Sequence, residues 1–300
     1  MSIGILTDST ADLNKNILKD FDMNIDIIPL SIHFGEEVFL DGIDISSEEF
    51  FKKLANSEKL PQTSQPTPND FKKIYKKMSK KYDEIISLHI SSGLSGTFNS
   101  AQTAAQQLPE IDIYPVDTSS ISLGLGFLTL MAARLAETAS SAEQVIGKIN
   151  KAKDKIFLFF TVDDMTYMEK GGRIGKARSL LGSFLNINPI ISLSTKTGKV
   201  EPLAKVRGSK KTLQKMLDLG MEQLKDASRA WLGFAHGDRE EDLKEFKKDL
   251  LTRIDQNLNL DYKVFQTRIS STIGCHVGPS VYAGVIFTEE GLLDFDLNSK

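Results

Sequence analysis

Residues 84–97 read EIISLHISSGLSGT, and the organisation of the chain follows from this stretch. Its first seven residues include three isoleucines and a leucine, which predicts a buried strand. Residues 98–108 are rich in Ala and Gln and favour a helix. Free N–H groups and the positive end of a helix dipole would meet in the loop between them, beside the hydroxyl groups of Ser91, Ser92, Ser95 and Thr97. Either this loop binds an anion, or Ser91 or Ser92 only caps the helix.

Similar short apolar segments lie on both sides of this stretch. Residues 3–7 and 111–116 read as buried strands, and an apolar run at 25–32 precedes an acid-rich loop. Residues 119–138 hold an apolar core helix. Strands that alternate with helices predict a parallel sheet with helices on both faces. We therefore expect residues 1–154 to form an α/β domain.

The pattern changes near residue 156. Residues 190–194 and 200–206 flank the sequence KTGK and predict a hairpin. Further strands and helices are expected at 157–162, 209–225, 231–235, 239–254 and 262–267. Hairpins mixed with helices predict a second domain of α+β type at residues 155–300, with a mixed or antiparallel sheet.

Composition excludes several classes of function. The chain has 300 residues, 40% of them hydrophobic and 26% charged, as in an ordinary soluble globular protein. A formal net charge of -3 gives no reason to expect nucleic-acid binding. The single cysteine, Cys275, excludes an internal disulfide and favours a cytoplasmic location. The four histidines show no ligand spacing, so we expect neither a metal nor another cofactor.

A lysine-rich helix is expected to begin at Thr67-Pro68-Asn69-Asp70, where a capping hydroxyl precedes a proline and an acid. Its apolar face would carry Phe71, Ile74, Tyr75 and Met78. Its other side would carry Lys72, Lys73, Lys76, Lys77, Lys80 and Lys81. Such a run is usually a solvated face, and it leaves open a transient contact with an anionic membrane surface or an acidic partner.

Polar residues recur where the predicted strands end. Asp8-Ser9, Thr63-Ser64 and the loop at 91–97 could converge, because ligands of parallel sheets lie at the carboxyl ends of the strands. Hydroxyl groups with one histidine, and no dedicated arginine clamp, suit a small monoanion. A carboxylate with an apolar body is the simplest ligand of that kind.

An acyl hydrolase is the alternative. Gly93-Leu94-Ser95-Gly96-Thr97 is one residue short of a nucleophile elbow, and Ser95, Asp117 and His276 follow the expected chain order. The β-branch of Thr97 would crowd the tight turn that an elbow needs. Cys275 and His276 are neighbours and would point apart on an extended chain, which argues against a Cys–His pair.

Five motifs in order resemble the DegV family of bacterial fatty-acid-binding proteins, the FakB subunits of fatty acid kinase. They are Asp8-Ser9-Thr10-Ala11-Asp12, Thr63-Ser64-Gln65-Pro66, Ser91 to Thr97, Gly171-Gly172-Arg173-Ile174 and His276-Val277-Gly278-Pro279. The resemblance covers residues 3–287. It implies a two-domain protein that buries one long acyl chain, holds the carboxyl group near the domain interface, and has no complete active site.

The resemblance also implies roles for individual residues. Thr63, Ser95 and His276 would bind the carboxylate, with Ser64, Ser92, Gly93 and Gly96 as supporting loop residues. Arg173, and more loosely Arg207, would contact a FakA-like kinase subunit that makes the acyl phosphate from ATP for phospholipid synthesis. We expect Phe98, Leu125, Phe127 and Phe184 as candidates for shaping the acyl pocket.

Overall fold

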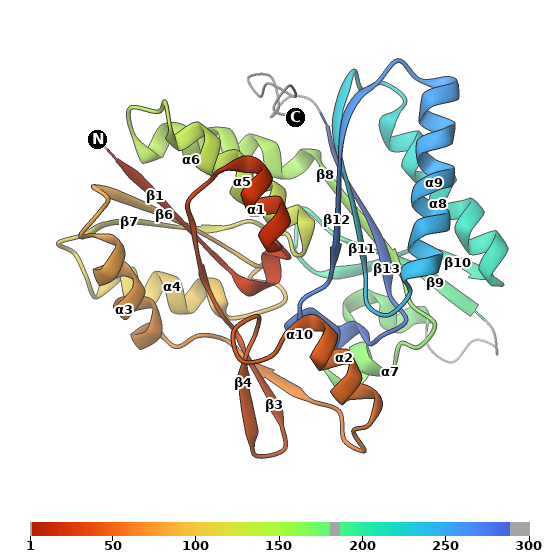
Figure 1. Cartoon of the computed structure of the whole chain (residues 1–300), viewed down its shortest axis with the longest axis horizontal. Coiled ribbons are helices and arrows are strands. Elements are labelled where there is room, and N and C mark those ends of the chain that lie inside the picture. The colour runs from red at the N-terminus through yellow and green to blue at the C-terminus, as the bar shows by residue number, and fades with distance from the viewer. Residues whose placement is uncertain (1, 181–186, 289–300) are drawn as a thin grey trace.

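Two large β-sheets organise the chain, and helix α5 (Leu123–Ala136) lies between them (Figure 1). The computed structural model describes residues 2–180 and 187–288. A third, small sheet projects from the body below the two large ones.

The first large sheet is built from the N-terminal half of the chain. Its strand order is β2-β1-β6-β7, and all neighbours are parallel. Helices α3 (Pro68–Met78) and α4 (Thr97–Gln106) pack on one face, and α5 and α6 (Ala142–Ala152) pack on the other. The strands are β1 (Ile3–Asp8), β2 (Ile25–Ile28), β6 (Glu84–His89) and β7 (Asp112–Asp117). The prediction of a parallel sheet with helices on both faces is confirmed.

The second large sheet has six strands in the order β10-β9-β8-β13-β11-β12. Only β11 and β12 pair in parallel, so the predicted mixed sheet is confirmed. Its strands are β8 (Ile156–Thr161), β9 (Ile187–Leu193), β10 (Val200–Arg207), β11 (Arg229–His236), β12 (Asp261–Arg268) and β13 (Tyr282–Thr288). Helices α8 (Ser209–Leu224) and α9 (Glu240–Asn257) cover its outer face, and α5 covers its inner face. We propose, as the sequence suggested, that the two domains comprise residues 1–154 and 155–300.

Helix α5 is apolar around its whole circumference, and residues 123–133 are all buried. A helix of this kind must be covered on every side. Phe127 packs against Trp231 of β11 with 5.4 Å between ring centroids. A Cβ at Gly233 would lie 2.9 Å from Leu123 and 3.0 Å from Phe127, so β11 approaches α5 closely because position 233 has no side chain.

The small sheet has the strand order β4-β3-β5 and was not predicted. The apolar run at 25–32 is two strands in different sheets, β2 and β3 (Ser31–Phe34), separated by Pro29 and Leu30. Proline has no N–H for a ladder, which favours a break there. The acid-rich loop contains β4 (Glu37–Leu40) and the start of α2 (Ser47–Ala55), and the proline-rich stretch supplies β5 (Gln62–Ser64).

Short helices complete the chain. They are η1 (Ser9–Ala11), α1 (Lys15–Phe21), η2 (Lys153–Lys155), α7 (Thr166–Lys170), η3 (Gly175–Leu180) and α10 (Ser271–Val277). The extended chain expected around His276 is wrong, because this residue lies on α10. The side chain of Asp41 accepts hydrogen bonds from the N–H groups of Ser271 and Thr272, which fixes the start of this helix.

We expect Gly233→Val to destabilise the protein by at least about 1 to 3 kcal/mol, because the new methyl groups collide with α5. Gly147→Ala is the matched control. Gly147 lies inside α6, and no neighbouring segment comes within 4 Å of the place that a methyl group would take. Alanine there should therefore raise the free energy of unfolding by about 0.5 to 1 kcal/mol. Urea unfolding of both variants measures the difference. Wild-type stability in Gly233→Val would contradict the close contact between β11 and α5.

Candidate functional site

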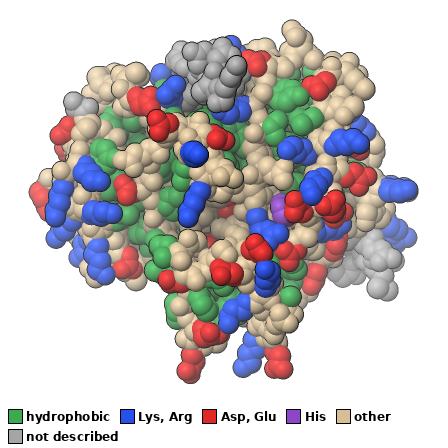
Figure 2. All heavy atoms as spheres, viewed as in Figure 1, with side chains coloured by type: hydrophobic (Ala, Val, Ile, Leu, Met, Phe, Trp, Pro, Cys, Tyr) green, Lys and Arg blue, Asp and Glu red, His purple; other side chains and the backbone are tan. Residues whose placement is uncertain are grey.

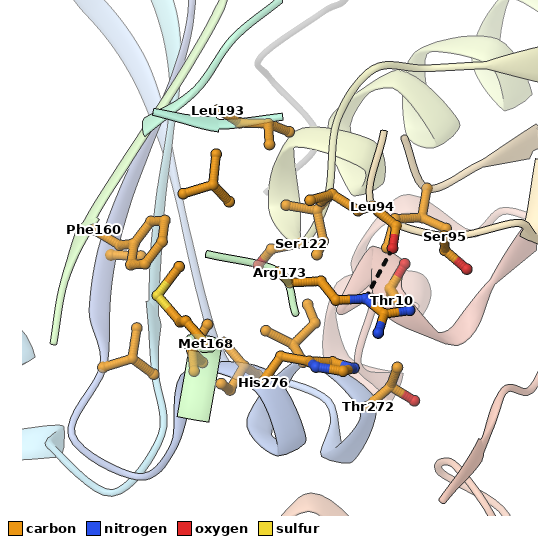
Figure 3. A pocket seen from close by; sticks show the side chains of 18 of the residues that line it. Thr10, Leu94, Ser95, Ser122, Phe160, Met168, Arg173, Leu193, Thr272 and His276 are labelled. Carbon is orange, nitrogen blue, oxygen red and sulfur yellow. Dashed lines mark hydrogen bonds between the residues drawn. The ribbon is translucent and has the colours of Figure 1, made fainter. Parts of the chain in front are cut away.

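A cavity lies where the N-terminal end of α5 meets the second sheet and α10 (Figure 3). Together with the open solvent at its mouth, it contains about 880 Å³ free of protein atoms. Its wall is mostly apolar: Leu30, Ile90, Leu94, Ile121, Leu158, Phe160, Met168, Leu193, Val200, Ile269, Ile273, Val277, Val281 and Ala283. The polar remainder of the wall is Thr10, Thr63, Ser95, Ser122, Arg173, Thr272 and His276.

The three predicted carboxylate-binding residues all line this cavity, although 213 residues separate Thr63 from His276. A hydrogen bond of 2.8 Å joins Thr63 Oγ1 to His276 Nε2. Pairing of β5 with β3, in which Thr63 lies opposite Ile32, places the threonine. Helix α10 places the histidine. Two distant segments therefore meet in one polar pair.

His276 is held as a neutral imidazole. Burial, and then the positive charge of Arg173, lowers the pKa of its side chain to about 4. Nδ1 is buried and has no hydrogen-bond partner among the described residues. If Nε2 carries the proton it donates to Thr63, and the Thr63 hydroxyl is then free to donate into the cavity. The neutral ring can therefore orient a donor without adding a charge.

Ser95 lies at the start of α4. Its Oγ is 2.8 Å from Thr97 Oγ1 and accepts a hydrogen bond from the N–H of Thr97 at 3.3 Å. The residue that caps α4 is Gly96, with no side-chain bond, so the hypothesis that Ser91 or Ser92 caps this helix is wrong. Ser95 makes no hydrogen bond to His276 in the described structure, because Nε2 of that ring is bonded to Thr63.

Arg173 is the charged residue of the cavity wall. Its guanidinium donates to the carbonyl oxygens of Gly171 at 2.8 Å and Leu94 at 3.2 Å, and the residue is exposed at the mouth (Figure 3). The family resemblance implies a partner contact for this arginine, and the sequence suggested an anion site without a dedicated arginine clamp. The structure places Arg173 in the same cavity wall as Ser95 and His276, so a positive charge lies close to the predicted anion site. Arg207, exposed at the end of β10, does not line the cavity.

The predicted supporting residues do not line the cavity. Ser64 Oγ bonds to His33 Nε2 at 2.8 Å, on the other side of its strand from Thr63. Ser92 is exposed. A Cβ at Gly96 would strike the Gln65 amide, and one at Gly93 would lie 2.7 Å from the carbonyl oxygens of Thr197 and Gly198. These glycines admit other parts of the protein, not a ligand.

A buried hydrogen bond connects the 91–97 loop to the β9–β10 hairpin. The Ser91 hydroxyl, fully buried, donates to the carbonyl oxygen of Gly198 at 2.7 Å. Gly198 has a positive φ of 60°, and a side chain there would strike Ser91. Leu193 and Val200 flank this turn and line the cavity. The hydrogen bond between Ser91 and Gly198 therefore holds the hairpin part of the cavity wall against the N-terminal domain.

Two buried acids, Asp12 and Asp41, bind the cavity-lining residues Ser122 and Thr272. Asp12 accepts hydrogen bonds from Ser122 Oγ at 2.5 Å and from the N–H of Ser270 at 2.8 Å. Burial raises the pKa of Asp12 to about 7 and raises the pKa of Asp41. Ser122 adopts φ 55°, ψ -146°, a conformation rare outside glycine, and its bond to Asp12 holds it there.

Sequence reasoning missed several wall residues and proposed wrong ones. Thr10 lies in one of the five motifs but had no assigned role, Ser122 was missed, and nothing in the sequence singled out Thr272. Phe98, Leu125 and Phe127 do not line the cavity. Phe184 lies outside the described residues. The signal that could have found Ser122 is its position just before the buried helix α5.

Within residues 2–180 and 187–288, no group of three or more His, Cys, Asp or Glu side chains could hold a metal ion. No helix in that part of the chain is long and apolar enough to cross a membrane. His89, fully buried, bonds to Asp8 Oδ2 at 3.0 Å and to Ser87 Oγ at 2.6 Å. None of these three residues lines the cavity, although Asp8 accepts a hydrogen bond from the hydroxyl group of Thr10, which does.

Comparisons with known proteins agree with this geometry. Residues 2–289 match the family model described as uncharacterised protein, DegV family. Protein DegV of Bacillus subtilis is 32% identical over 279 residues, covering 93% of this chain and 96% of that protein. The solved structure of a fatty-acid-binding DegV family protein from Thermus thermophilus is 30% identical with a TM-score of 0.88, covering 96% of this chain and 100% of that one. A stearic-acid-binding protein from Eubacterium ventriosum is 26% identical with a TM-score of 0.81, covering 95% and 98%.

The depressed pKa of His276 predicts a pH-dependent contribution to stability. The unfolded chain binds this proton near its ordinary pKa of 6.5 and the folded chain near 4, so stability falls as pH drops through that window. Compared with His276→Asn in ligand-stripped protein, the wild type should lose about 2 to 3 kcal/mol of its free energy of unfolding between those values. Denaturant titrations at several pH values measure the difference. A difference that stays constant with pH would contradict the buried, neutral imidazole.

Proposed function

The chain belongs to the DegV family, and we propose that it binds one long-chain fatty acid and presents the carboxyl group to a kinase. The observation that carries the proposal is one cavity with an apolar wall and a compact polar group of Thr63, Ser95 and His276. The fatty acids bound by the relatives from Thermus thermophilus and Eubacterium ventriosum support the choice of ligand class.

The apolar wall would set the affinity. A sixteen-carbon acid buries roughly 14 methylene groups at about 0.8 kcal/mol each, an upper bound near 11 kcal/mol. Association costs about 4 to 15 kcal/mol of translational and rotational freedom, so the net affinity is well below this bound. Figure 3 shows Phe160 and Leu193 on the side of the cavity away from Ser95 and Thr272, so an acyl chain has apolar side chains to lie against.

The polar group would set the orientation. A carboxylate between Thr63 and Ser95 would accept from neutral hydroxyl groups, and His276 would fix the direction of the Thr63 donor. The start of α4 adds the positive end of a helix dipole beside Ser95. Arg173 supplies the charge of opposite sign at the mouth. One negative charge on the ligand then meets one positive charge on the wall.

The position of the polar group supports presentation to a kinase. Arg173 is exposed at the mouth while it contacts the loop that carries Ser95, so a second protein could reach the carboxyl group there. We propose a FakA-like catalytic subunit as that protein, with docking through Arg173 and, more loosely, Arg207. The chain itself would have no catalytic residue. The hydrolase alternative has less support, because Ser95 is bonded to Thr97 and has no adjacent base in the described structure.

Contact with an anionic membrane surface stays a weaker proposal. The lysine-rich side of α3 is largely exposed, and its apolar face is buried through Phe71, Tyr75 and Met78. Lys73 pairs with Asp70 at 3.4 Å. A solvated face explains these lysines equally well.

A long-chain fatty acid should co-purify with the protein at near one molecule per chain, because the apolar cavity is costly to leave filled with water. Mass spectrometry after gentle denaturation would identify it. Nucleotide or sugar phosphate in the extract, or no ligand together with no uptake of added palmitate, would contradict the proposal.

Thr63→Val and Ser95→Ala should each weaken palmitate binding to stripped protein by about 1 to 3 kcal/mol, because each removes a hydrogen-bond donor to the charged carboxylate. Ser64→Ala and Ser92→Ala are matched controls from the same segments. Their side chains face away from the cavity or lie exposed, so their affinity should equal that of the wild type. Fluorescence titration compares the four variants. Equal losses in controls and site variants would show that the polar group is wrongly assigned.

A further inference from the structure

The small β4-β3-β5 sheet and the turn after β4 carry most of the exposed large hydrophobic side chains of the described residues. Among residues 2–180 and 187–288, four large hydrophobic side chains are exposed. Three of them, Val38 (55% exposed), Leu40 (36%) and Ile43 (66%), lie on β4 or in the turn that follows it. Leu203 on β10 is the fourth. Such clustering marks an interaction surface more often than scattered exposure does.

The two faces of this sheet have different roles. Ile32 pairs with both Thr63 and Phe39, so these residues share the inner face, where Thr63 reaches the cavity. Val38 pairs with His33 and Leu40 pairs with Ser31, so these four residues share the outer face. The sheet is therefore a thin wall between the polar end of the cavity and an exposed apolar face.

The loops beside this outer face carry exposed acids and no cation. Residues 20–51 contain no Lys or Arg. Glu36, in the β3–β4 turn, and Asp44, in the turn after β4, are exposed. Glu37 pairs with Phe34 and so lies on the inner face, while Glu48 and Glu49 lie on α2, whose Phe50 packs against Phe34. The nearby cations form ion pairs within the chain: Lys53 pairs with Glu37 at 2.8 Å, and Lys52 pairs with Glu48 at 2.6 Å. In Figure 2 acidic side chains are prominent on the lower projection, where Figure 1 places β3 and β4.

The charges around the outer face and the hydrogen bonding at the edge of β4 indicate which kind of molecule could bind there. An anionic membrane would be repelled by the acids. A symmetric contact with a second copy would set the same acids against each other. Addition of a strand at β4 is blocked at Leu40, whose N–H donates to Asp44 at 2.8 Å and whose carbonyl oxygen accepts from Ile43 and Asp44. A different protein with cationic side chains meets none of these obstacles.

We propose that the outer face of the β4-β3-β5 sheet docks a second protein whose contact surface has an apolar centre surrounded by Lys and Arg. This inference rests on the proposed function: the docked protein would be the kinase subunit that reaches the carboxyl group at the mouth beside Arg173, and the small sheet would be a second contact with that subunit. Val38 and Ile43 would fill its apolar centre, and Glu36 and Asp44 would pair with its cations. Docking here places the partner one sheet thickness from Thr63.

The test uses the full chain, loaded with palmitate, and a purified bacterial fatty acid kinase catalytic subunit as the probe. The double variant Val38→Ser/Ile43→Ser should raise the dissociation constant at least ten-fold and lower acyl-phosphate formation in parallel. Glu36→Lys should slow association and weaken its dependence on salt. Leu203→Ser is the matched control, since it removes the remaining exposed large apolar side chain of the described chain, and it should change the dissociation constant less than two-fold.

Palmitate occupancy, measured in the same samples, separates this inference from the proposed function. A protein that binds no fatty acid defeats the proposed function. Full occupancy with unchanged kinase binding in the double variant, or an equal loss in Leu203→Ser, overturns only the docking surface. No kinase binding by the wild type overturns the docking surface together with the kinase part of the proposed function. The surface is also wrongly assigned if the double variant instead abolishes self-association in sedimentation or binding to phosphatidylglycerol vesicles.

Discussion

The burial of α5 between two sheets is the constraint on which the rest of the structure depends. A helix that is apolar on all sides cannot leave one face in water, so a sheet must cover it from each direction. The parallel N-terminal sheet does so through β1 and β6, and the mixed sheet does so through β11 and β13. Stacking two sheets on one helix leaves space at the helix end, and there Ile121 and Ser122 enter the cavity wall.

The polar end of the cavity is built mostly from groups that carry no charge. Burial keeps the imidazole of His276 neutral by lowering its pKa, and burial raises the pKa of Asp12 toward neutrality. Threonine and serine hydroxyl groups supply the remaining donors. Arg173, exposed at the mouth, is the charged member of the wall. A fatty acid carboxylate bound here would keep its negative charge close to solvent and to an approaching partner, while the tail lies in the dry interior.

The small sheet has one face toward the cavity and one face toward solvent. Its inner face holds Thr63 against His276, and its outer face exposes Val38 and Leu40. Neighbouring residues of a strand alternate between the faces, so the donor Thr63 is next in sequence to residues whose side chains lie on the outer face. The proline-rich segment that forms β5 is stiff, which suits a strand that must hold a donor in a fixed direction.

Sequence alone determined the alternation of strands and helices, the change to a mixed sheet near residue 156 and the burial of α5. These features depend on local periodicity, which survives in one dimension. It also pointed to Thr63, Ser95 and His276, but only through resemblance to a family. Tertiary structure alone decided that Thr63 bonds to His276, that Arg173 joins the cavity wall, and that Phe127 packs in the core and not around the cavity. Those outcomes join segments that lie far apart along the chain, and no local pattern encodes which side chains meet when two sheets close on a helix.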